Sequence, residues 1–230
     1  GGTRLRRGGR GAHPRNLTAF GVQFVTAGGE SATGWATYNG RMRFHFLVPL
    51  LLAMVSVAAH ANSTRACADY SSKIPNVAPA LCEAANMRDM QGRSVKGRTL
   101  WGTDIQPADA NFRVLVVGGI HGDEMSSSSL VFHWIGLAQT PPSDMSLNIH
   151  WRFVPSLNPD GLFAKPSRRT NANGVDLNRN FPTPNWARDA KDYWETRTKR
   201  DPRRWPGNKP LSEPESRFLL EQMDSFKPNL

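Results

Sequence analysis

Two short polar segments carry the side chains in this sequence that are best suited to chemistry. The first places His121 three residues before Glu124, and the second places Asn178 beside Arg179. A neutral imidazole and a carboxylate are both good ligands for zinc, and this spacing, across a turn that enters a helix, lets both face one point. An arginine fork binds a carboxylate through two parallel hydrogen bonds. The sequence therefore predicts part of a metal site and a binding site for a carboxylate.

A buried strand followed by a helix must position the first segment. Residues 112–117 are a short, β-branched apolar run that ends at Gly118, which is typical of a strand buried on both faces. Residues 123–138 have helical periodicity, and residues 147–155 alternate as a second strand would. This order predicts a βαβ unit with His121 beyond the carboxyl end of its first strand, where ligands bind in open α/β sheets. We expect an α/β fold with a mixed, largely parallel sheet flanked by helices.

Three further stretches have weaker signals. Residues 76–90 are expected to form a short helix, and residues 93–102 a pair of strands. Residues 156–210 are expected to form a long polar loop. Loops of such length inside a compact domain usually carry function.

The last helix has a clearer start. Ser212 and Glu215 have the spacing of a capping box, which predicts Ser212 as the N-cap of a helix that runs to Phe226. Residues 227–230 would then lead into another strand. We therefore expect the domain to be incomplete at the C-terminus.

The N-terminal part of the sequence has the composition of a leader. Residues 1–41 are rich in Gly, Arg, Ser and Thr, and we expect a non-native or disordered upstream extension there. Residues 42–61 carry a basic residue, an apolar stretch and a small-x-small cleavage site, which predict a secretory signal peptide. The apolar run is too short for a good membrane span, and an uncleaved anchor is the alternative. No stable membrane span is expected after cleavage.

The positive charge of the chain is concentrated in this leader. The whole sequence has a net charge of +10, but residues 1–61 hold seven Arg and one Glu, which leaves a net +4 for the remainder. A domain with that charge does not call for a nucleic-acid partner.

The two cysteines lie just after the expected cleavage site, in an N-terminal segment at residues 62–97. In an exported protein, Cys67 and Cys82 are expected to form a disulfide. Two free buried thiols are the alternative reading.

Several other polar and aromatic residues have ordinary structural readings. Arg179 alone would be read as the partner of a structural carboxylate such as Asp176. His133 and His150 fall within a helix and a strand, where packing is their expected role. Packing is also the preferred reading of three tryptophans in the long loop, Trp186, Trp194 and Trp205, and lining a pocket is the alternative.

Four motifs in order resemble the M14 zinc metallocarboxypeptidase family, especially its bacterial branch of murein peptide amidases and D,L-carboxypeptidases. The motifs are His121–Glu124, Asn158–Gly161, Asn173–Phe181 and Ser212–Glu215. The resemblance covers residues 98–230, which it identifies as part of a peptidase catalytic domain.

The resemblance also implies the roles of single residues. It implies one zinc ion per chain, with His121 and Glu124 as two of its ligands. It implies that Asn178 and Arg179 hold the free carboxylate of the substrate.

Family members carry three more functional groups. One is an arginine that polarises the scissile carbonyl, and either Arg168 or Arg169 occupies the matching stretch. The others are a third zinc ligand, usually His, and a general-base Glu, both after the helix at Ser212–Glu215. No His follows His150 in the sequence, so we expect both groups beyond Leu230 and expect this fragment alone to be inactive.

The expected function is zinc-dependent hydrolysis of a peptide or amide bond next to a free carboxylate. The expected substrate is a cell-wall stem peptide in the periplasm. One alternative is a zinc deacylase similar to aspartoacylase or succinylglutamate desuccinylase, and another is a non-catalytic peptide-binding pseudo-enzyme. The side-chain preference, the oligomeric state and the true start site are left open.

Overall fold

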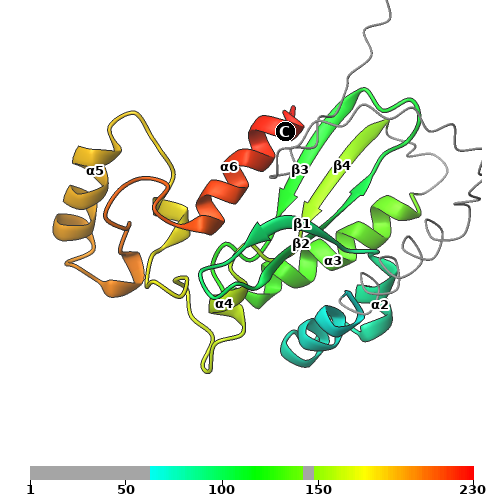
Figure 1. Ribbon diagram of the computed structural model, residues 1–230, viewed down its shortest axis with the longest axis horizontal. Coiled ribbons are helices and arrows are strands. Elements are labelled where there is room, and N and C mark those ends of the chain that lie inside the picture. The colour runs from blue at the N-terminus through cyan, green and yellow to red at the C-terminus, as the bar shows by residue number, and fades with distance from the viewer. Residues whose placement is uncertain (1–62, 142–147) are drawn as a thin grey trace, which may run out of the picture. The chain divides into compact units, whose positions relative to one another are not determined.

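The computed structural model describes residues 63–141 and 148–230. The expected upstream extension, residues 1–41, and the expected signal peptide, residues 42–61, lie outside the described residues. The described part forms a mixed sheet with helices on both faces (Figure 1). The predicted α/β class, with a mixed sheet flanked by helices, is confirmed.

The sheet and its flanking helices have the following bounds. The strands are β1 Arg88–Arg93, β2 Thr99–Ile105, β3 Phe112–Val117 and β4 Ile149–Val154. The helices are residues 63–73, α2 Pro79–Ala84, α3 Met125–Gln139, α4 Pro159–Leu162, α5 Trp186–Asp192 and α6 Pro214–Phe226. Single helical turns are η1 Leu177–Arg179, η2 Tyr193–Arg197 and η3 Pro202–Arg204.

The strands lie in the order β1-β2-β4-β3. β3 pairs with β4 in parallel, whereas β1 with β2 and β2 with β4 pair in antiparallel. The prediction of a largely parallel sheet is therefore wrong for the described strands, because the short turn at residues 94–98 makes β1 and β2 a hairpin. The parallel pair is joined through α3, which is the predicted βαβ unit. Its first strand has the predicted bounds because its nearly continuous apolar run ends at a glycine, but it is not buried on both faces as predicted, since only Val114 is buried.

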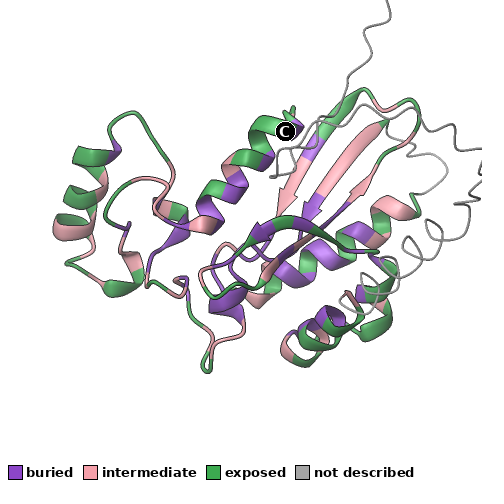
Figure 2. Ribbon diagram, in the orientation of Figure 1, coloured by how far each residue is buried: buried purple, intermediate pink, exposed green. Residues whose placement is uncertain are grey.

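Alternation along the strands divides the apolar side chains between two cores. Leu115 and Val117 of β3 pack with Val154 of β4 on the face that α6 covers. Val116 and Phe153 point to the opposite face and pack against α3. Figure 1 shows α6 on one side of the sheet and α2 and α3 on the other, and Figure 2 shows the buried stripes on α3 and α6.

The last two residues continue the sheet beyond β3. The Asn229 amide donates to the Arg113 carbonyl at 2.8 Å, and the Leu115 amide donates to the Leu230 carbonyl at 2.9 Å. Residues 229–230 therefore lie along the outer edge of β3, which agrees with the expectation that a strand follows α6.

The predicted capping box is wrong. The N-cap of α6 is Glu213, not Ser212, and it makes no side-chain capping hydrogen bond. Glu215 does not reach back to the helix start, because its Oε1 accepts from the Val95 amide at 3.0 Å and its Oε2 from Asn171 at 3.1 Å. The Glu215 side chain therefore binds residues distant in the sequence instead of capping the helix.

The predicted helix at residues 76–90 is also too long. α2 covers only six residues, and Asn86 then adopts a left-handed conformation with φ of 48°. β1 begins two residues later at Arg88 and pairs with β2. The last residues of the predicted helix therefore belong to strand β1 of the sheet.

A disulfide ties the N-terminal helix to α2. It joins Cys67 and Cys82, which are 2% and 0% exposed. Tyr70 lies one helical turn after Cys67 and packs edge-on against Phe132 of α3, with 5.3 Å between ring centroids. The N-terminal segment is thus fastened to the same core as α3.

Candidate metal and carboxylate site

The turn between β3 and α3 carries the first predicted pair. Gly119 has a φ of +56°, and a Cβ atom there would lie 2.5 Å from Ser128 Oγ. Only glycine fits this turn without strain. The turn brings His121 to the carboxyl end of β3 and Glu124 to the N-cap of α3.

The two ring nitrogens of His121 face two different carboxylates. Its side chain is buried, and Nε2 lies 3.0 Å from Asp176 Oδ1. Nδ1 lies 3.0 Å from Glu124 Oε2 but forms no hydrogen bond, although it is shielded from solvent. An orphaned imidazole nitrogen beside a carboxylate oxygen is the arrangement that a shared metal ion would satisfy. The two side chains therefore fit a zinc ion.

Asp176 is the hub of the site. Its side chain is fully buried, and besides His121 it contacts Arg169, whose Nε donates to Oδ2 at 3.0 Å. Arg169 also reaches Glu124, with Nη1 3.3 Å from Oε1. Two carboxylates, an imidazole and a guanidinium thus form one connected group that holds both candidate ligands.

Charged neighbours within this group shift the pKa values of His121 and Asp176 more than burial does. Burial alone would lower the pKa of His121, but the carboxylates of Asp176 and Glu124 raise it. Burial alone would raise the pKa of Asp176, but His121 and Arg169 hold it below its ordinary value. Asp176 is therefore ionised, and it favours a proton on Nε2 of His121.

The second predicted pair follows Asp176 directly. Asp176 caps η1 by accepting from the Asn178 amide at 3.2 Å. Arg179 Nε lies 3.4 Å from Asp176 Oδ2. Asn178 and Arg179 line a hollow of about 230 Å³, together with aromatic side chains of Phe181, Trp186 and Tyr193.

A buried polar cluster fixes the loop that presents this pair. Asn171 donates to both Glu213, at 2.7 Å, and Glu215, at 3.1 Å. Asn180, just after Arg179, donates to the carbonyls of Pro206 and Lys209. Burial is the main cause of the raised pKa of Glu215. The start of α6 therefore serves as the base on which the loop rests.

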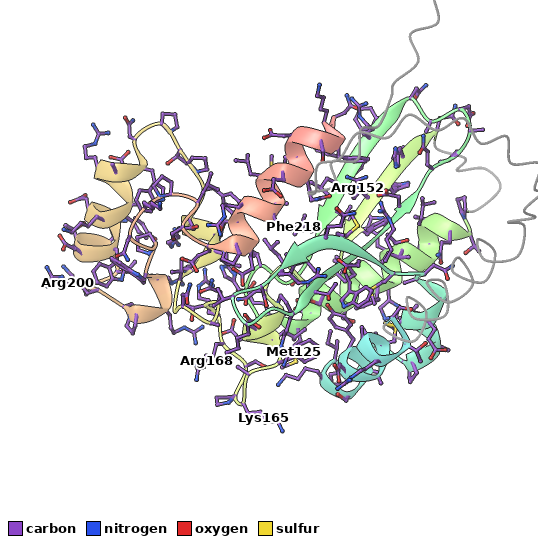
Figure 3. All side chains as sticks on the ribbon, viewed as in Figure 1. Met125, Arg152, Lys165, Arg168, Arg200 and Phe218 are labelled. Carbon is purple, nitrogen blue, oxygen red and sulfur yellow. A yellow bond between two sulfur atoms is a disulfide. The ribbon has the colours of Figure 1, made fainter. Side chains whose placement is uncertain are left out.

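The structure separates the two arginines that the sequence left open. Arg169 is 8% exposed and lies against Glu124 and Asp176. Arg168 is exposed, and Figure 3 shows it with Lys165 on the outer side of the loop after α4. Only Arg169 joins the other site residues.

Three contributors were missed or misread from the sequence. Asp176 was read as a possible partner of Arg179, but its shortest contacts are to His121 and Arg169. Its position two residues before Asn178 was the available signal. Trp186 and Tyr193 touch Arg179, and no local pattern pointed to that contact.

Two of the predicted metal ligands, His121 and Glu124, lie together in the described residues. Within residues 63–141 and 148–230, no three His, Cys, Asp or Glu side chains are grouped so that they could hold a metal ion. The same residues include no helix that is long and apolar enough to cross a membrane.

Fold and site define an α/β protein with a histidine–carboxylate pair at the end of a parallel strand, next to an Asn–Arg pair. The zinc carboxypeptidase family, peptidase family M14, matches residues 67–230. The chain therefore belongs to the zinc carboxypeptidase family. The predicted family is confirmed, and zinc is the cofactor that membership implies.

Individual relatives agree with this assignment. Murein peptide amidase A from Escherichia coli (strain K12) is 38% identical over 138 residues, which are 57% of this chain and 54% of the relative. Carboxypeptidase SOL1 from Arabidopsis thaliana is 38% identical over 101 residues, 40% of this chain and 20% of the relative. The solved carboxypeptidase A from Helicoverpa armigera has the same fold, with a TM-score of 0.51 at 22% identity over 64% of this chain and 41% of that one. The chain spans about half the length of the murein peptide amidases that it matches.

Proposed function

We propose that the protein is a zinc-dependent metallocarboxypeptidase that hydrolyses a peptide or amide bond next to a free carboxylate. The observation that carries the proposal is the buried Nδ1 of His121, which lies at ion-pair distance, 3.0 Å, from Glu124 Oε2 without a hydrogen bond, while Asp176 links His121 to Arg179. A metal ligand pair and a carboxylate-binding pair, joined through Asp176, are two of the parts that such a reaction needs.

In this proposal, Nδ1 of His121 and the carboxylate of Glu124 hold the zinc ion. Zinc supplies Lewis-acid polarisation of a carbonyl and an acidic bound water. The Asp176 carboxylate accepts a hydrogen bond from Nε2–H of His121, and this tautomer leaves the lone pair of Nδ1 free for the metal. Arg169 balances the negative charge of both carboxylates, which keeps Glu124 turned toward His121.

Arg179 and Asn178 select the chain end. The guanidinium presents a planar pair of donors to a terminal carboxylate, and the side-chain amide of Asn178 adds a further donor. Fixing the carboxylate there brings the adjacent bond toward His121 and Glu124, and such positioning supplies much of the rate. Of the two arginines considered for the scissile carbonyl, we propose Arg169, because it lies among the site residues.

The substrate class follows from relatives rather than from the site. Murein peptide amidase A is the name of the 38% identical relative, and that name supports a cell-wall peptide as the substrate here. Export to the periplasm through the signal peptide predicted at residues 42–61 would bring the enzyme to such a peptide, and it is part of the proposal.

The test compares one wall-type peptide with its C-terminal amide, using protein expressed from the complete gene. We expect hydrolysis of the free acid, lost on chelation and restored by zinc, and at least about 100-fold slower hydrolysis of the amide. Acyl-amino acids form a third arm. Hydrolysis of these alone would replace the proposal with a zinc deacylase, and hydrolysis of none would leave a binding protein.

A further inference from the structure

Two groups, the Asp176 carboxylate and the Tyr193 ring, contact the guanidinium of Arg179. Its Nε lies 3.4 Å from Asp176 Oδ2. Its Cζ lies over the ring of Tyr193, 4.7 Å from the centroid. A guanidinium stacks favourably on an aromatic face at this distance. The side chain is therefore held by a buried carboxylate and an aromatic ring.

The backbone of Arg179 is fastened as well. Trp186 donates from its indole Nε1 to the Arg179 carbonyl at 2.7 Å. Trp186 is only 9% exposed, so its own position is set by packing. The same short segment of chain thus holds both the backbone and the side chain of Arg179.

Tyr193 lies where α5 passes into a π-helical turn, and its own amide still donates to the Asp189 carbonyl as in an α-helix. α5 ends at Asp192, and Tyr193–Arg197 form a π-helical turn in which the Thr198 amide donates to the Tyr193 carbonyl at 3.1 Å. Such turns are rare and occur often at functional sites. Here the first residue of the turn is the one that meets Arg179.

The contacts of Arg179 with Asp176 and Tyr193, here called the clamp, leave Nη1 and Nη2 of Arg179 available. In the described part of the chain, no hydrogen bond is formed by Nη1 or Nη2, and Arg179 lines the hollow with Tyr193 and Asn178. An arginine side chain loses rotamer entropy when it is ordered. A clamp that orders it beforehand removes part of that cost from substrate binding.

We infer that Tyr193 and Trp186 are positioning residues that hold Arg179 ready for the carboxylate of the substrate. The inference rests on the proposed function. It assigns a role to the segment of residues 186–197, whose aromatic side chains would otherwise count as packing.

The test measures discrimination between a peptide with a free C-terminal carboxylate and the same peptide as its amide, with zinc-loaded protein from the complete gene. Tyr193→Leu should lower the ratio of the two kcat/KM values by about 3- to 10-fold, the range of a guanidinium–aromatic contact. The loss should appear in KM for the free acid, with kcat for both peptides little changed. Tyr193→Phe keeps the ring and should keep the ratio within about 2-fold.

Two controls separate positioning from general damage. Trp194→Leu removes a ring in the same segment that packs on Trp205 rather than on Arg179, so it should leave the ratio unchanged. In NMR spectra, the side-chain Hε of Arg179 should show an upfield ring-current shift that Tyr193→Leu abolishes and Tyr193→Phe retains. Trp186→Phe deletes the hydrogen bond to the Arg179 carbonyl and should lower the ratio in the same direction as Tyr193→Leu.

The outcomes are distinct. A wild-type protein without preference for the free acid would overturn the proposed function and the inference with it. A wild-type preference that survives intact in Tyr193→Leu would overturn the inference alone. Equal losses in Tyr193→Leu and Tyr193→Phe, or equal losses for acid and amide, would also overturn it.

Discussion

Asp176 and His121 face each other inside the molecule, with 3.0 Å between Asp176 Oδ1 and the imidazole Nε2. This contact commits one ring nitrogen to a buried carboxylate and leaves the other, Nδ1, toward Glu124. The pair explains why a histidine and a glutamate only three residues apart can act together. An element far along the chain sets the orientation of the ring.

The first prediction concerns that contact. Asp176→Asn, in protein expressed from the complete gene, should weaken zinc binding by about 10- to 100-fold, because the partner that orients a metal-binding histidine is lost. It should also lower the free energy of unfolding by about 3 kcal/mol, since Arg169 loses its buried counter-charge. Competition with a chromophoric chelator measures the affinity. Asp189→Asn is the control, because Asp189 is exposed and, among the described residues, forms an ion pair with its neighbour Arg188 alone. A folded Asp176→Asn variant with wild-type affinity would contradict the account.

A second prediction concerns the glycine that lets α4 approach the site. A Cβ atom on Gly122 would collide with the backbone of Gly161 and Leu162, which cannot move as a flexible side chain could. Gly122→Ala should therefore lower the free energy of unfolding by about 2 to 4 kcal/mol. Gly136→Ala is the matched change in α3, where the nearest atom is Leu81 Cδ1 at 3.9 Å. That variant should be more stable by about 0.5 to 1 kcal/mol, because alanine favours a helix. Urea unfolding should separate the two, and equal effects would refute the argument.

The βαβ unit was predictable from the sequence for a specific reason. β3 is a nearly continuous apolar run that stops at Gly118, so its bounds follow from the local sequence. The capping box at Ser212 and Glu215 was not reliable in the same way. Glu215 has partners on Val95 and Asn171, and such contacts cannot be read from a four-residue pattern.

In the candidate site, too, some residues could be predicted from the local sequence and others only from the fold. His121, Glu124, Asn178 and Arg179 stand out because their types and spacing suit chemistry. Arg169 could not be told from Arg168 in the sequence, since neighbours in a loop point in different directions and only the fold decides which one turns inward. The contact of Tyr193 with Arg179 joins the end of α5 to η1, and such a tertiary contact has no sequence signature.

The third prediction concerns acid sensitivity. Asp104 and Arg152 lie opposite each other on β2 and β4 and form two hydrogen bonds, at 2.8 and 2.9 Å. Burial alone would raise the pKa of Asp104, but Arg152 and Arg88 outweigh burial and hold it below its ordinary value of 3.8. Because the folded-state pKa is the lower one, the stabilisation is complete above the unfolded-state pKa. It is lost as the pH falls through the folded-state pKa.

Asp104→Asn should therefore lower the free energy of unfolding by about 1 to 2 kcal/mol at neutral pH, a reduced figure for a partly exposed pair. The difference from the wild type should shrink as the pH falls below about 4, where the wild-type carboxyl is protonated. Urea unfolding at several pH values measures this. Asp189→Asn serves again as the control, since exposure screens its pair with Arg188. A difference that stays constant down to low pH would contradict the assignment.

The fourth prediction concerns the disulfide. Cys67 and Cys82 are 15 residues apart, and a bridge closing such a loop stabilises a fold by about 3 kcal/mol. Replacing both with Ala should lower the free energy of unfolding by about that amount and loosen the N-terminal helix from α3. Wild-type protein unfolded in the presence of a reductant should match the double variant. Equal stability of oxidised wild type and double variant would show that the bridge contributes nothing.

The most direct test of the central claim is the zinc content of protein expressed from the complete gene, measured by elemental analysis beside His121→Ala. The account predicts one zinc ion per wild-type chain and loss of that ion in the variant. Wild-type protein without zinc, or a variant that keeps it, would contradict the assignment of His121 and Glu124 as the metal-binding pair.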